Sequence, residues 1–170
     1  MNLLLKLEKT INIFFVALQI LFVLGIAGVI IGIIRGDILN INNLEPTSAY
    51  NLRSWKFLVI LFSYFAIYYL FIRVVSHLKQ TIPFLKKGFS FSEPVASKLK
   101  QAGKLLIFIG YSLAILSIIT PLFLTSKFKI DVIETILSPF FFVILGLFLK
   151  YFGQAFLQAR DLQNENNLTI

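Results

Sequence analysis

Long stretches without any charged side chain alternate with short polar segments along this chain. Four blocks lack Asp, Glu, Lys, Arg and His altogether: Thr10–Ile34, Phe57–Ile72, Leu105–Ser126 and Thr135–Leu149. A helix needs about 20 apolar residues to cross the hydrocarbon core of a bilayer, which is about 30 Å thick. Two blocks reach that length alone, and the other two continue with apolar side chains past a flanking basic residue. The pattern predicts four transmembrane helices.

The pattern and its flanking residues predict an all-α fold, a polytopic membrane protein with four helices in a bundle. We expect one membrane domain over residues 1–170, with transmembrane helices at about 11–34, 54–76, 104–126 and 134–156, a basic hairpin over 77–103 and a tail over 157–170. The second helix is expected to continue toward Lys87, with Pro83 as a kink or an earlier end. Ser92 is the expected N-cap of the third helix, which Pro121 is expected to kink.

Three glycines are spaced four residues apart near the end of the first block: Gly28, Gly32 and Gly36. On a helix this spacing makes a stripe without side chains, which another helix can approach closely. We interpret the stripe as a helix-packing face. Packing against another helix of the same chain is favoured, because three are available, and a homo-oligomer contact is the alternative.

Few polar side chains fall within the expected spans, and no side chain in the four blocks carries a charge. Proton- and ion-coupled transporters place Asp, Glu, His or Arg there, so the pattern argues against such a transporter. Gln19 is expected to face a neighbouring helix. Lys150 interrupts the last apolar run and is expected to extend its ammonium group to the headgroups, about one turn from the interface.

The distribution of Lys and Arg predicts the orientation in the membrane. Eleven of the sixteen flank the termini and the central hairpin, and five flank the two connections on the other side, whereas the eight acidic residues divide equally. Short loops rich in Lys and Arg remain in the cytoplasm. Both termini and the hairpin are therefore expected to be cytoplasmic (N-in, C-in).

The composition argues against a soluble domain, a nucleic-acid-binding protein and an enzyme. The chain is 58% hydrophobic with nineteen Phe, too apolar for a soluble domain of 170 residues. Its formal charge of +8 lies between the helices rather than on one face of a soluble fold, so direct nucleic-acid binding is not expected. It has no cysteine and one histidine, and we find no nucleophile–base pair, carboxylate pair or ligand set. We expect no catalytic site, no cofactor, no metal and no enzymatic activity.

The central segment from residue 76 to 104 is the strongest candidate for a functional surface, because six lysines and one acid are interleaved with aromatic side chains. The simpler interpretation is that the lysines set the topology and touch anionic membrane lipids. The functional interpretation is a docking surface for a cytoplasmic partner, together with the chain end. The candidate contact residues are Lys86, Lys87, Phe89, Phe91, Lys98, Lys100, Lys104, Leu168, Thr169 and Ile170.

Two stretches together resemble a bacterial membrane family catalogued as domain of unknown function 2975. The first is Phe91-Ser-Glu-Pro-Val-Ala-Ser-Lys-Leu-Lys-Gln-Ala-Gly103, and the second is Leu162-Gln-Asn-Glu-Asn-Asn-Leu-Thr-Ile170. The resemblance covers essentially the whole chain and implies a four-helix protein of the bacterial cytoplasmic (inner) membrane. Members are often encoded beside a small helix-turn-helix regulator, which implies by analogy a regulatory cytoplasmic partner.

These observations favour a non-enzymatic integral membrane protein that binds or regulates a cytoplasmic partner. The alternative is a small transporter or lipid-handling membrane protein, which acts as a homo-oligomer through the glycine stripe.

Overall fold

The computed structural model describes residues 2–35, 55–86, 92–125 and 133–168, which are almost entirely helical. The elements in chain order are α1 (Asn2–Arg35), α2 (Trp55–Lys79), α3 (Ile82–Lys86), α4 (Glu93–Thr125), η1 (Ile133–Leu137), which is one π-helical turn, and α5 (Ser138–Leu168). Four helices are long and apolar enough to cross a membrane. The all-α fold with four apolar helices packed together is confirmed, and the chain is a multi-pass membrane protein.

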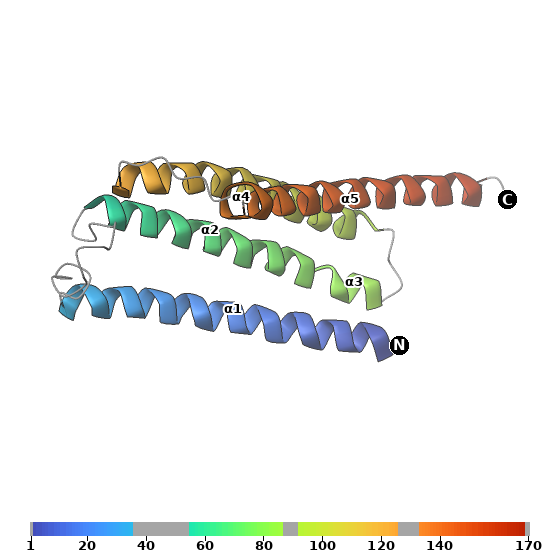
Figure 1. Ribbon diagram of the computed structural model, residues 1–170. Helices are drawn as coiled ribbons and strands as arrows, with labels where there is room; N and C mark the ends of the chain where they lie inside the picture. The colour runs from blue at the N-terminus through green and yellow to red at the C-terminus, as the bar shows by residue number, and fades with distance from the viewer. Residues whose placement is uncertain (1, 36–54, 87–91, 126–132, 169–170) are drawn as a thin grey trace.

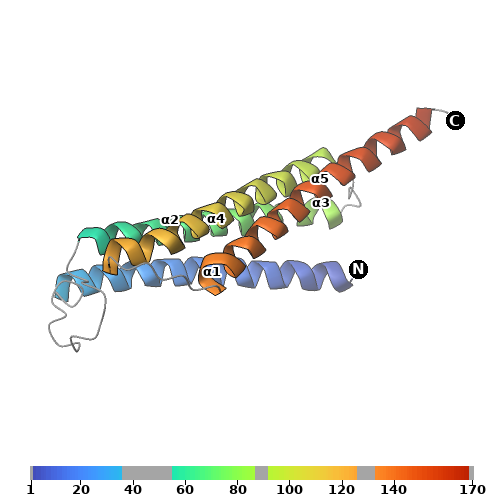
Figure 2. The ribbon, with the colours of Figure 1, turned by 45° about the horizontal axis from the view of Figure 1, so that its top comes forward.

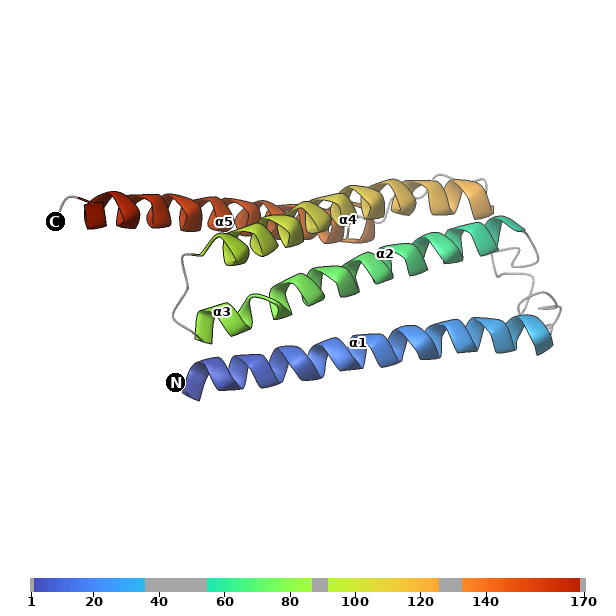
Figure 3. The same cartoon turned by 180° about the vertical axis from the view of Figure 1, so that it is seen from behind.

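Successive long helices run in opposite directions (Figure 1). Their contacts give the order α1, α2, α4, α5 across the molecule. Packing is most extensive between α4 and α5, intermediate between α2 and α4, and least extensive between α1 and α2. Helices α1 and α5 are therefore the outer helices of this order. The view from behind shows α1 on the far side of α2 from α4 and α5 (Figure 3). The N-terminus, α3 and the end of α5 lie at one end of the molecule, in agreement with the arrangement expected from the basic residues.

The core lies between α2 and α4. Val74, Leu106 and Ile109 are at most 2% exposed, and the ring of Phe142 on α5 meets Phe71 on α2 edge-on, with centroids 6.0 Å apart. Most other large apolar side chains point outward, which suits a surface covered by lipid chains.

Small residues bring α4 and α5 into backbone contact. Three pairs face each other along this interface: Ala96 with Gly153, Gly103 with Gly146, and Gly110 with Pro139. A Cβ added at the glycine of each pair would lie 2.6–2.8 Å from the carbonyl oxygen of the opposite residue. On each helix the three positions are seven residues apart, so they recur on one face of a coiled helix pair. The interface therefore depends on the missing side chains.

The glycine stripe of α1 does not pack in the same way. Gly28 is exposed, and no described atom beyond its own turn of α1 lies within 4 Å of a Cβ added there. Gly25 instead faces α2, with the ring of Phe65 3.1 Å from an added Cβ. The expected packing against another helix of this chain is therefore wrong at Gly28. Gly32 is half-buried, and Gly36 lies outside the described residues.

Helix α2 ends earlier than its sequence suggests. It stops at Lys79, where a two-residue turn interrupts the helix and the Thr81 hydroxyl donates to the carbonyl oxygen of Leu78 at 2.7 Å, and α3 then continues in about the same direction (Figure 1). Pro83 then lies in the first turn of α3, where no backbone N–H is needed. The second helix therefore ends four residues before Pro83, and the helical residues that follow belong to the separate helix α3.

The start of α4 at Glu93 is as predicted, and Ser92 takes the predicted N-cap position, but its hydroxyl does not cap the helix. The backbone carbonyl of Ser92 accepts from Ala96, whereas the buried Ser92 hydroxyl has no hydrogen-bond partner among the described residues. Helix α4 continues through Pro121 to Thr125.

The polar contact between α1 and α2 comes from a tyrosine. The hydroxyl of Tyr68 donates to the backbone carbonyl of Leu18 at 3.1 Å. Leu18 is buried against α2, and the side chain of the next residue, Gln19, is exposed. The prediction that Gln19 faces a neighbouring helix is wrong, because the buried face of α1 is one position further back.

Candidate functional site

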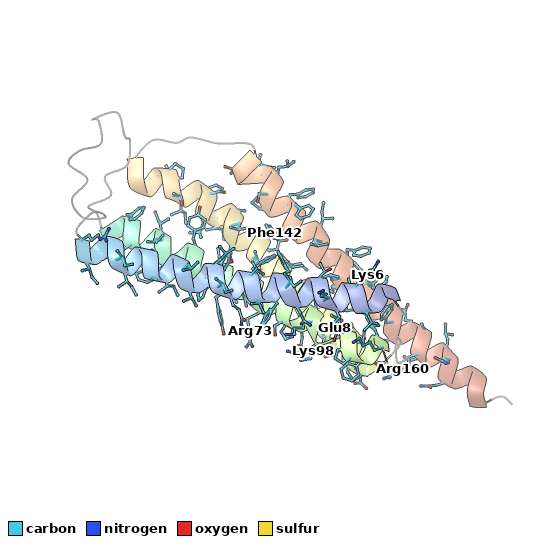
Figure 4. The ribbon with its side chains drawn as sticks, turned by 90° about the horizontal axis from the view of Figure 1, so that it is seen from below. Lys6, Glu8, Arg73, Lys98, Phe142 and Arg160 are labelled. Carbon is cyan, nitrogen blue, oxygen red and sulfur yellow. The ribbon has the colours of Figure 1, made fainter. Side chains whose placement is uncertain are left out.

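Basic side chains gather at the end of the molecule that holds the N-terminus and the last turns of α5. We call this region the basic end and define it as residues 6–9, 76–86, 93–104 and 150–165. Figure 4 shows Lys6, Lys98 and Arg160, from three different helices, toward this end. The fold therefore brings together basic segments that are far apart in the sequence.

Polar contacts between elements organise the basic end. Lys86 of α3 pairs with Glu8 of α1, and the ammonium of Lys79 lies 4.8 Å from the centre of the Phe15 ring. Arg160 of α5 donates to the carboxylate of Glu93 on α4 at 3.1 Å. These groups are partly exposed, so the pairs add little to stability, but they show which elements lie beside one another.

A groove runs between the first turns of α4 and the facing part of α5. Its volume is about 300 Å³, and its lining consists of five polar residues of α4 and one apolar residue of α5: Glu93, Ser97, Lys100, Gln101, Lys104 and Leu157. The α4 residues follow one another at intervals of three or four positions, apart from the adjacent Lys100 and Gln101, so they lie on one helical face.

The last turns of α5 extend beyond α4. The pairing of Gly153 with Ala96 and of Arg160 with Glu93 places the first turn of α4 beside residues 153–160. Helix α5 continues to Leu168, so its last two turns have no α4 backbone beside them, and they project from the molecule (Figure 2). Residues 161–165 are exposed, and Leu162 is 66% exposed.

The structure places four of the ten candidate contact residues at the basic end with their side chains described. Lys100 and Lys104 line the groove, Lys98 is half-buried on another face of α4, and Lys86 pairs with Glu8. Leu168 is the last residue of α5. The remaining candidates, Lys87, Phe89, Phe91, Thr169 and Ile170, lie outside the described residues.

The sequence interpretation missed Glu93, Ser97, Gln101 and Leu157 as members of the groove. The sequence indicates part of this set, because Glu93, Ser97 and Gln101 are spaced four apart, on one helical face, within the basic segment. Which residue of α5 faces them depends on the glycine register, which was not recognised.

The same register explains Lys150. Its backbone nitrogen lies 2.8 Å from a Cβ added at Gly103, next to Lys104, the last charged residue before the apolar block of α4. Lys150 is therefore level with the edge of the apolar region, as expected from its position in the sequence.

A second cavity, of about 310 Å³, lies between α1 and α2 in the apolar part of the molecule. Its lining is apolar and aromatic: Leu21, Phe22, Leu61, Tyr64, Phe65 and Tyr68. The rings of Phe22 and Tyr68 stack with their centroids 5.7 Å apart. Among the residues that the structure describes, no Asp, Glu, His, Lys or Arg lines this cavity.

Comparisons with family models, with curated proteins and with solved structures found no match for this chain. The resemblance to the family named above stays a prediction. Within the helical segments that the structure describes, no three His, Cys, Asp or Glu side chains come together as they would around a metal ion.

Proposed function

We propose that this chain is a non-enzymatic membrane protein of the bacterial inner membrane that binds and regulates a soluble cytoplasmic partner at its basic end. The single observation that carries the proposal is the projection of α5 beyond α4. A helix end with no neighbouring helix beside it is only marginally stable in water. A partner that covers this end would supply the missing packing.

The chemistry of the projecting segment suggests how a partner would bind. Leu162 offers an apolar anchor beside the polar side chains of residues 161 and 163–165. The segment itself carries Asp161 and Glu165, and Lys100 and Lys104 line the groove further back along α4. An apolar anchor inside a charged surround is typical of a small protein interface. We therefore expect a partner with an apolar pocket for Leu162 inside a polar, charged rim.

The resemblance to the bacterial membrane family suggests what kind of protein the partner is. If the chain is similar in function to members encoded beside a helix-turn-helix regulator, the partner is that regulator, held at the membrane away from its DNA target. This step is an analogy. It is independent of the geometric argument that places the interface at the end of α5.

Substituting Leu162 by Asp should abolish partner binding without unfolding the protein, because the side chain is 66% exposed. Losing the burial of one leucine costs about 1.5–3 kcal/mol, which corresponds to a loss of affinity of about 10- to 150-fold. The measurement is recovery of partner by the full-length protein, crosslinked in cells and purified in detergent, with the bound proteins identified by mass spectrometry. Deletion of Asn166–Ile170 should also reduce recovery.

Asn164→Asp is the matched control, because it introduces the same charge on the opposite face of α5, at another exposed residue. Wild type and this control should recover the same soluble protein, and Leu162→Asp should not. Recovery of the same proteins by all four forms, or of none by the wild type, would refute the proposal.

The apolar cavity between α1 and α2 favours the second candidate, a lipid-handling protein. Its volume lies at the lower limit of typical ligand sites. The two helices that line it, α1 and α2, pack less closely against each other than α4 and α5 do. Among the described lining residues, the only polar side-chain groups are two tyrosine hydroxyls, one of which is bound to Leu18. Ion-coupled transport through this cavity is therefore not supported.

A further inference from the structure

The groove between α4 and α5 combines two cations with two neutral donors. Glu93 at one end is engaged by Arg160 at 3.1 Å. Lys100 and Lys104 also line the groove, and neither forms an ion pair with the residues that the structure describes. Gln101 donates to the Ser97 hydroxyl at 3.4 Å, so both are close enough to donate to one ligand. The groove is therefore suited to an anion rather than a cation.

One of the two lysines is partly held in place by the packing of the helices. The Cγ atom of Lys100 lies 3.0 Å from a Cβ added at Gly153, so the stem of this lysine crosses α5 where a side chain is missing. Lys100 is half-buried, whereas Lys104 is exposed. Partial ordering of the Lys100 stem lowers the entropy cost of binding a ligand there.

The position of the groove along the helices selects the source of the anion. Lys104 is the last charged residue before the apolar block of α4, and Lys150 of α5 is level with the neighbouring Gly103. The groove therefore begins where the apolar region ends, at the level of the lipid headgroups. Leu157 lies at the other end of the groove, beside the first turn of α4. A phospholipid presents its phosphate at the level of Lys104 with its acyl chains beside the apolar block of α4, whereas free phosphate gains nothing from that block.

We propose that this groove binds the phosphate of an anionic phospholipid headgroup, with Lys100 and Lys104 as the cationic contacts and Ser97 and Gln101 as hydrogen-bond donors. Basic pockets between transmembrane helices on the cytoplasmic side are suited to such headgroups. The site does not depend on a soluble partner. It goes beyond general attraction of lysines to the membrane, because it assigns the binding to two of the eleven basic residues on this side.

The test uses native mass spectrometry of the full-length protein in detergent, titrated with dioleoyl phosphatidylglycerol. We expect one tightly retained lipid, and about 30-fold weaker retention in the double variant Lys100→Gln/Lys104→Gln, since each lysine near an anionic surface contributes about fivefold in affinity. Lys104 is exposed, so Lys104→Gln alone should leave the fold intact and weaken retention about fivefold. Lys100→Arg/Lys104→Arg should preserve retention.

The matched control is Lys6→Gln/Lys98→Gln, which removes the same charge from the basic end without touching the groove. Unchanged retention in this control supports the site. An equal loss in the control would mean diffuse attraction and would overturn the proposal. Equal retention of dioleoyl phosphatidylcholine, or full displacement of the lipid by millimolar inorganic phosphate, would also overturn it, since the first denies the anionic preference and the second makes the ligand a soluble phosphate.

Discussion

Replacing Gly103 by leucine should force α4 and α5 apart and destabilise the protein by about 3 kcal/mol or more. A Cβ at this position would lie 2.6 Å from the carbonyl oxygen of Gly146 and 2.8 Å from the backbone nitrogen of Lys150. Both are backbone atoms of a helix, which cannot move aside without moving the whole segment. The free energy of unfolding can be measured by titrating the purified protein from a mild detergent into sodium dodecyl sulfate and following helix content.

Gly28→Leu is the control for this substitution. It makes the same chemical change within another membrane helix, at a site where no described atom beyond the same helical turn lies within 4 Å of the added Cβ. Because leucine favours a helix more than glycine does, stability should be unchanged or slightly higher. A similar loss at both positions would mean that the contact between α4 and α5 is not what holds the bundle together. Dimers that the wild type forms and Gly28→Leu does not would assign the stripe on α1 to a second copy.

Leu106→Ala should cost about 2–4 kcal/mol of unfolding free energy. Leu106 is 1% exposed in the core between α2 and α4, so truncation leaves a cavity that neither protein nor lipid fills. In a bilayer, lipid chains are as apolar as leucine, and the packing contacts rather than transfer from water stabilise the helix pair. The same denaturation experiment measures the effect.

Phe108→Ala, two residues further along α4, separates these two contributions. Phe108 is 58% exposed, and its ring faces outward toward the lipid. More apolar surface is removed than at Leu106, but lipid can occupy the space, so we expect a loss below about 1 kcal/mol. If Phe108→Ala proved the more damaging substitution, the assignment of the buried face of α4 would be wrong.

The sequence predicted the number and approximate location of the spans because a bilayer imposes its own length scale on apolar segments. It predicted the helix ends less well. Helix α1 begins at Asn2 rather than near residue 11, because helical hydrogen bonds continue beyond the apolar region that charge patterns delimit. The break between Lys79 and Ile82 depends on the Thr81 hydroxyl, a local contact that no hydrophobic pattern records.

The helix contacts were the least predictable part. The spacing of small residues four apart indicates Gly28, where the packing is loose, and does not indicate Gly103 and Gly146, where the two helices come closest. The decisive spacing is seven residues on both α4 and α5, which becomes visible only when the two helices are compared as a pair. The groove could not be predicted for the same reason. The spacing along α4 indicates its lining residues on that helix, but the position of Leu157 beside them follows only from how α4 and α5 are aligned.

The proposed function requires that the basic end face the cytoplasm and carry the interaction surface. The chain has no native cysteine, so single cysteines can be introduced as clean probes at Ser97 and Gln163 on the basic end, and at Asn43 in the first connection. Each variant is treated with a membrane-impermeant maleimide in intact spheroplasts and again after permeabilisation. Labelling of Asn43→Cys in intact spheroplasts, with labelling of Ser97→Cys and Gln163→Cys only after permeabilisation, is the predicted result. Labelling of the two basic-end cysteines in intact spheroplasts would contradict the account, because no cytoplasmic partner could then reach that surface.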